Sequence, residues 1–154
     1  MKIGIVIYSK SGNTLLVAEA LAKNLISLGH LASLEKLTAV DKKQVDVKKI
    51  VLESAPKLDG YDVVILGSPV HGFSLSPVMQ AYLLQTSELA GKRVKGFVTQ
   101  HFPYPWMGGS RALGQMMTAC KAKGAHGENT GIVNWSSKHR DQRIQEVIDK
   151  LSAI

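Results

Sequence analysis

Strand-like and helix-like segments alternate along this chain of 154 residues, and the alternation limits the folds that it can adopt. Runs of apolar, mostly β-branched residues with the length of a strand lie at 3–8, 62–67 and 94–99. Between them, apolar residues recur every three or four positions, as in amphipathic helices. Strands that are joined through helices pair in parallel and need cover on both faces. The pattern therefore predicts a three-layer α/β domain around a parallel sheet.

Helical spacing is clearest in four segments. Gly29 directly follows the segment 14–28, and Gly124 directly follows the segment 110–123. Each glycine is therefore in the position of a helix C-terminal cap. Ser76 and Pro77 form a typical helix start, because the serine can cap the helix and the first turn does not use the N–H that proline lacks. The four helices expected are 14–28, 77–86, 110–123 and 144–151.

The other elements have weaker signals. A polar strand at 31–37 suits the edge of a sheet, and a last short strand at 131–135 has a start that is open back to 125. Residues 38–60 are the hardest to assign, with a short fifth helix expected within 41–52 and a loop at 56–60. The whole chain, 1–154, is then one domain with a five-stranded, doubly wound parallel sheet and about five helices.

The amino-acid composition indicates the class of protein and the compartment in which this domain is expected. Hydrophobic residues make up 45% and charged residues 20%, which is typical of a globular protein in water. No apolar run approaches the roughly 20 residues that cross a bilayer. Met1 leads directly into the first strand without a signal peptide, and the lone Cys120 cannot form an internal disulfide. We therefore expect a cytoplasmic protein, with Cys120 in the core.

The formal net charge of +7 has two interpretations, an anionic partner or a basic surface that is only solvated. The lysines and arginines are scattered, with no dense stripe along a helix and no nucleic-acid motif. Binding to nucleic acid is therefore not expected. Most of these charges are interpreted as solvated, and attraction of an anionic redox partner is the second interpretation. The five histidines show no metal-ligand spacing, so no metal is expected either.

In doubly wound sheets, ligands bind beyond the carboxyl ends of the strands, which places a site in the loops after Tyr8, Gly67 and Thr99. The first loop brings hydroxyls, an amide and a glycine to the start of a helix, where backbone N–H groups and the helix dipole favour a phosphate. The alternative is an ordinary capped helix. The residues of this loop are Ser9, Lys10, Ser11, Gly12, Asn13 and Thr14.

These six residues, Ser-Lys-Ser-Gly-Asn-Thr, resemble the phosphate loop of the flavodoxin family, which reads Ser/Thr, any residue, Ser/Thr, Gly, Asn/Thr, Thr. The resemblance extends over the chain in element order. It implies a flavodoxin-like fold with strand order 2-1-3-4-5, a short-chain form of that fold, and FMN as the ligand. It also implies that the peptide at Gly72 responds to protonation of the flavin.

The second and third loops are expected to hold the flavin ring. Three aromatic residues fall within five positions of the third loop, where polar residues are the rule, so they need a partner. They form either a wall over the ring or its substrate, or an oligomer contact or small core under the loop. His71 and His101 are candidates for contact with ring or substrate, although His71 suits an ordinary loop position equally well. The candidate residues are Pro69, Val70, His71, Gly72, Phe73, Thr99, Gln100, His101, Phe102, Tyr104, Trp106 and Gly108.

Three functions remain open on these grounds. The first is an FMN oxidoreductase that takes electrons from NADH or NADPH and passes them to a quinone or another small acceptor. The second is a one-electron shuttle between proteins, although such flavodoxins are usually acidic and this chain is basic. The third is a binding module of the same fold without redox activity. A homo-oligomer is compatible with all three.

Overall fold

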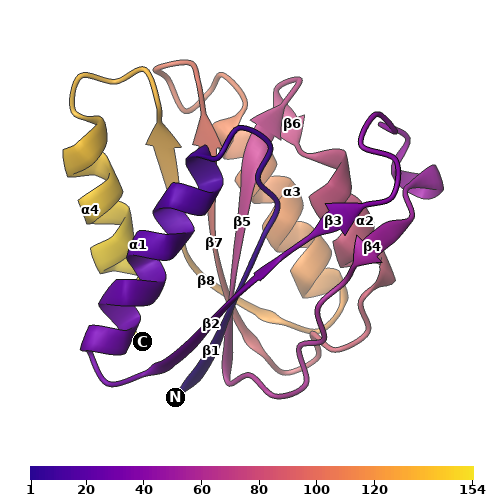
Figure 1. The fold of residues 1–154 in the computed structure, drawn as a ribbon, viewed down its shortest axis with the longest axis horizontal. Coiled ribbons are helices and arrows are strands. Elements are labelled where there is room, and N and C mark those ends of the chain that lie inside the picture. The colour runs from indigo at the N-terminus through magenta and orange to yellow at the C-terminus, as the bar shows by residue number, and fades with distance from the viewer.

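The computed structural model describes all residues from 1 to 154 and contains one main sheet between two layers of helices (Figure 1). The order of its long strands is β2-β1-β5-β7-β8, and all neighbours among them run in parallel. Counted along the chain, this is the expected order 2-1-3-4-5. The long strands are β1 (Lys2–Ile7), β2 (Leu31–Lys36), β5 (Val63–His71), β7 (Arg93–Gln100) and β8 (His126–Asn134).

Two helices cover each face of the sheet. Helices α1 (Asn13–Ser27) and α4 (Arg140–Leu151) lie on one face, and α2 (Pro77–Gln85) and α3 (Gly109–Ala122) lie on the other (Figure 1). Successive strand residues point to opposite faces, so β1 gives Ile5 to the core under α1 and α4 and Val6 to the core under α2 and α3. The four expected helices are therefore confirmed within one residue or two, apart from the start of α4.

The helix expected within 41–52 is wrong. This segment contains only one turn of 3₁₀-helix, η1 (Val47–Lys49), between two short antiparallel strands, β3 (Thr38–Ala39) and β4 (Leu52–Ser54). The side chains of Asp41 and Asp46 accept hydrogen bonds from backbone N–H groups two residues ahead, which competes with helical bonding. The protein consequently has four α-helices rather than about five.

Two strands are longer than their apolar runs. Strand β8 begins at His126, where an edge strand tolerates exposed polar residues, and β5 continues past Gly67 to His71. Beyond His71, the chain reverses and β6 (Ser74–Leu75) pairs back on β5. Helix α2 starts as expected, with the Ser76 hydroxyl accepting from the N–H of Met79.

No helix of the structure is both long enough and apolar enough to cross a bilayer. The thiol of Cys120 is fully buried in the core under α3, and burial raises its pKa to about 12. Cys120 is therefore a protonated core residue, as its position in an apolar helix face predicts.

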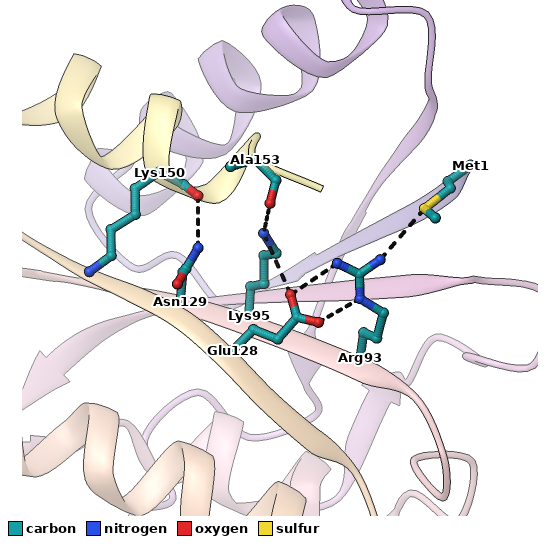
Figure 2. Close-up of polar contacts among 7 residues, drawn as sticks. All are labelled: Met1, Arg93, Lys95, Glu128, Asn129, Lys150 and Ala153. Atoms are coloured by element: carbon teal, nitrogen blue, oxygen red, sulfur yellow. Dashed lines mark hydrogen bonds and ion pairs between the residues drawn. The ribbon is translucent and has the colours of Figure 1, made fainter.

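A buried lysine joins the sheet to the end of α4. Lys95 of β7 has no exposed surface, and its Nζ donates to the carbonyl of Ala153 at 2.5 Å and lies 3.7 Å from Glu128 Oε2 (Figure 2). Arg93 forms two hydrogen bonds to the same carboxylate, at 2.5 and 3.2 Å. Burial lowers the pKa of Lys95, and the hydrogen bond from Arg93 lowers the pKa of Glu128. The cluster connects β7, β8 and the chain end after α4.

Gly67, in the middle of β5, is a glycine because its neighbours leave no room for a side chain. A Cβ at this position would lie 2.6 Å from Cε1 of Phe97 and 2.9 Å from Cγ2 of Ile7, and both side chains are fully buried. We expect Gly67→Ala to lower the free energy of unfolding by about 1–2 kcal/mol through overpacking. Urea denaturation checks this, with Gly60→Ala as control because a Cβ there meets nothing within 4 Å. Equal effects of the two substitutions would contradict the packing argument.

Candidate functional site

The three loops meet at one cavity of about 800 Å³ at the carboxyl end of the sheet. The first, second and third loop regions all contribute side chains to it, as the fold predicts. From the expected site, the residues that line the cavity are Lys10, Ser11, Asn13, Pro69, Val70, His71, Thr99, Gln100 and His101.

The first loop leaves the start of α1 open. Gly12 is the N-cap residue, with φ of 94°, and it forms no side-chain cap. Ser9 Oγ accepts from the N–H of Leu15 at 3.3 Å, whereas the N–H groups of Asn13 and Thr14 have no partner in the chain. A Cβ on Gly12 would meet nothing within 4 Å. The loop is thus no ordinary capped helix, and its free N–H groups and helix dipole lie where an anion can approach.

Thr14 lies behind the cavity and does not line it. Its side chain is 1% exposed, and its Oγ1 is 2.9 Å from Oγ1 of Thr99. Because Thr99 is the next-to-last residue of β7 and Thr14 lies in the first turn of α1, this hydrogen bond joins the start of α1 to the strand end that precedes the third loop. The structure therefore places Ser11 and Asn13 at the cavity and Thr14 in the support beneath it.

The second loop is a tight hairpin between β5 and β6. Val70 pairs with Leu75 and His71 with Ser74, so only Gly72 and Phe73 form the turn. Both turn residues have positive φ, 55° at Gly72 and 62° at Phe73. A phenylalanine in this region is strained by on the order of 1 kcal/mol, and such strain is concentrated at functional sites. Pro69, Val70 and His71, which were expected in a loop, are strand residues.

Four aromatic rings of the second and third loops stack in two pairs. The rings of Phe73 and Phe102 are 5.9 Å apart and almost parallel, at 7°. Tyr104 and Trp106 form a second stack at 5.5 Å and 4°, and Trp106 remains 75% exposed. A small hollow of about 140 Å³ lies between the Phe73 turn and the start of the third loop. None of these four aromatic residues lines the large cavity. Phe73 and Phe102 line the small hollow, which shares Val70, Gln100 and His101 with the cavity, and Tyr104 and Trp106 line neither.

Two side-chain amides, those of Gln100 and Asn134, fix the backbone of the third loop. The Gln100 amide Nε2 donates to the carbonyls of Phe102 and Tyr104 at 2.7 and 2.6 Å. Asn134 donates to the carbonyl of Pro103 from the end of β8. Gly108, expected at the cofactor, is instead buried at the start of α3, where a Cβ would lie 2.7 Å from Cγ1 of Val70. It lets the third loop pack closely against the second.

The sequence did not indicate one wall of the cavity. Residues between β3 and β4 line it, together with Tyr8 and the start of α2. The pair Lys42-Lys43 in that segment appeared as scattered surface charge, and only the β3–β4 hairpin brings it to the site. No lining residue carries a carboxylate. The missed residues are Tyr8, Lys42, Lys43, Gln44, Val45, Ser76, Pro77 and Val78.

Comparison with known proteins agrees with this arrangement. The sequence model of one family, described as NADPH-dependent FMN reductase, matches residues 1–139. No curated protein matches the chain.

Solved structures share the fold at low sequence identity. A flavodoxin from Streptococcus pneumoniae has a TM-score of 0.69 at 18% identity, with 99% of each chain covered. The two-electron reduced flavodoxin of Megasphaera elsdenii has a TM-score of 0.67 at 21% identity, also with 99% of each chain covered. A flavoprotein from Lactobacillus acidophilus in complex with FMN has a TM-score of 0.66 at 16% identity, covering 95% of this chain and 97% of that one. These similarities establish the flavodoxin-like fold.

Proposed function

Because this chain belongs to the family of NADPH-dependent FMN reductases and has FMN as its cofactor, we propose that it is an oxidoreductase that takes electrons from NADPH or NADH and passes them to a quinone or another small acceptor. The observation that carries the proposal is the uncapped start of α1, which opens beside a cavity of about 800 Å³ lined from all three loops. The donor set suits a phosphate monoester, because it offers backbone N–H groups and the hydroxyl of Ser11 without an acidic neighbour.

The residues at the other end of the site fit the flavin ring. The Gly72–Phe73 turn and the start of the third loop enclose a hollow with apolar walls, as a flat aromatic ring requires. His71 and His101 line the cavity beside it, and we assign to them contact with the ring or the substrate. The Gly72 peptide has open space around it, since a Cβ there would meet nothing within 4 Å. We assign it the role of a backbone group that turns toward the polar edge of the ring.

Bound FMN supplies the chemistry of hydride and electron transfer, and the chain binds and orients it. The first loop would hold the phosphate, and the residues of the second and third loops would hold the ring. The Thr14–Thr99 hydrogen bond and the Gln100 amide keep these loops in one geometry. Phe73 and Phe102, which stack on each other, line the small apolar hollow that we assign to the ring.

The donor is tested by mixing the FMN-loaded protein with NADPH or NADH under anaerobic conditions in a stopped-flow instrument. We expect either nucleotide to bleach the absorbance of the bound flavin with a rate that saturates with its concentration. The control is the same amount of free FMN mixed with the nucleotide without protein. It measures the direct reduction of FMN in solution, which is then subtracted. Absence of bleaching with both nucleotides would reject the reductase.

Two exposed aromatic residues, Phe73 and Trp106, also favour a second candidate, a one-electron shuttle that docks to a protein partner. Phe73 and Trp106 are 54% and 75% exposed beside the expected edge of the ring, and interfaces are enriched in such residues. A shuttle would exchange electrons with a reduced protein donor while NADPH and NADH leave its flavin unchanged. The stopped-flow experiment therefore separates the two candidates.

A further inference from the structure

The cavity has a cationic wall in addition to the phosphate-binding start of α1. Lys42 and Lys43 line it from the segment between β3 and β4, and Lys10 lines it from the first loop. Lysines that gather on a concave surface without a carboxylate raise the local potential for anions. The phosphate of FMN has its own neutral donors at α1, so Lys42 and Lys43 are available to a second anionic group.

The acidic residues of the same segment do not neutralise this wall. Asp41 Oδ1 accepts from the N–H of Lys43 at 2.9 Å, and Asp46 Oδ1 accepts from the N–H of Lys48 at 3.1 Å. Both carboxylates thus bind backbone and shape the turn. None of the ion pairs in the structure includes Lys42 or Lys43. Their ammonium groups remain free to bind a ligand.

The wall is fixed to the body of the domain. Val40 donates its N–H to the carbonyl of Val51 at 2.9 Å, which closes the hairpin below the turn. The carbonyl of Ile50 accepts from Gln85 Nε2 of α2 at 3.3 Å, and the Ile50 side chain is buried. Figure 1 shows the loop between β3 and β4 extending beside α2 to the level of β6. The hairpin that carries the two exposed lysines is therefore tied to α2 before any ligand binds.

We propose that Lys42 and Lys43 bind a phosphate group of the pyridine nucleotide that donates electrons, at a place separate from the FMN phosphate. The inference rests on the proposed function and adds to it a binding site for the donor. Ammonium groups bind phosphate as point charges, and both NADPH and NADH carry a pyrophosphate. NADPH has a further phosphate at the 2′ position, so contact with that group would make this wall the source of preference for NADPH over NADH.

The test compares two double variants of the FMN-loaded protein. Lys42→Ala/Lys43→Ala removes the wall, and Lys48→Ala/Lys49→Ala removes the same charge from the same segment at positions that do not line the cavity. We expect the first variant to raise the half-saturating NADPH concentration for flavin bleaching at least about tenfold, with the limiting rate within about twofold. The control variant should change either value less than about threefold. Unchanged NADH kinetics assign the contact to the 2′-phosphate, and an equal change assigns it to the pyrophosphate.

Three results would overturn the inference while the reductase stands: no change in the first variant, equal changes in both variants, or a loss of FMN affinity in place of nucleotide affinity. Calorimetric binding of 2′,5′-ADP and of ADP to the FMN-loaded protein gives an independent measurement. If neither NADPH nor NADH bleaches the wild-type flavin, the proposed electron donor is rejected. The binding constants of 2′,5′-ADP and ADP then test by themselves whether Lys42 and Lys43 bind a nucleotide phosphate. Equal binding constants in wild type and the first variant, or no binding at all, then reject it.

Discussion

Ser11→Asp is expected to weaken FMN binding by at least about 100-fold and riboflavin binding by less than about threefold. Ser11 is exposed, lines the cavity and directly precedes Gly12, the N-cap residue of α1. A carboxylate there opposes the doubly charged phosphate at short range in a partly enclosed site. Riboflavin has the same ring and ribityl chain without the phosphate, so it does not meet this repulsion. Quenching of flavin fluorescence on titration measures both affinities.

Ser11→Asn is the matched control, because it has nearly the size and shape of the aspartate without its charge. It should reduce FMN affinity by less than about tenfold. The fold should tolerate both changes, since an acidic side chain near the start of a helix is favourable. Equal losses for FMN and riboflavin in Ser11→Asp would show that the first loop does not hold the phosphate, and an unchanged melting temperature would exclude unfolding as the cause.

Glu128→Ala is expected to lower the free energy of unfolding by about 2–4 kcal/mol. The carboxylate is the anionic partner of Lys95, which is fully buried, and of Arg93 (Figure 2). Without it, the Lys95 ammonium keeps only the carbonyl of Ala153 as a partner, has no exposed surface and lies near the positive charge of Arg93. The expected loss is below that of a wholly buried pair, because the Glu128 side chain is 27% exposed. Urea denaturation at neutral pH measures the effect.

The double variant Lys95→Met/Glu128→Ala distinguishes the unpaired charge from simple loss of packing. Methionine fills much of the volume of Lys95 without a charge, so the double variant should recover at least half of the stability that Glu128→Ala loses. A double variant that is no more stable than Glu128→Ala would contradict the role of the buried charge.

The same cluster predicts how stability depends on pH. The pKa of Glu128 is lower in the folded protein than its ordinary value of 4.5, so its stabilising effect is present above pH 4.5. That effect is lost as pH falls through the folded-state pKa, and the difference between wild type and Glu128→Ala should shrink there. Lys95 acts in the same direction at the alkaline end, because its lowered pKa makes folding more favourable as pH rises toward 10.5.

Local sequence patterns were sufficient for most of the long strands and for the four α-helices. β-Branched runs, helical spacing and the Ser76-Pro77 helix start depend on neighbours within a few residues, and each appears in the structure as expected. The open start of α1 could be predicted for the same reason, because Ser11, Gly12 and Asn13 directly precede or begin that helix, whereas their binding of phosphate stays a prediction. The helix predicted within 41–52 was wrong for an equally local reason. The side chains of Asp41 and Asp46 bind backbone N–H groups two residues ahead, and these turns compete with helical hydrogen bonding.

The tertiary structure decided the features that depend on residues far apart in the chain. The Thr14–Thr99 hydrogen bond joins residues 85 positions apart, and the stack of Phe73 on Phe102 depends on how two loops pack. Lys95 reads as one more basic residue until the fold encloses it between β8 and the end of α4. Lys42 and Lys43 reach the cavity only because the β3–β4 hairpin packs on α2. Periodicity determines which face of an element is buried, whereas the partner of that face is set by long-range packing, which no local pattern contains.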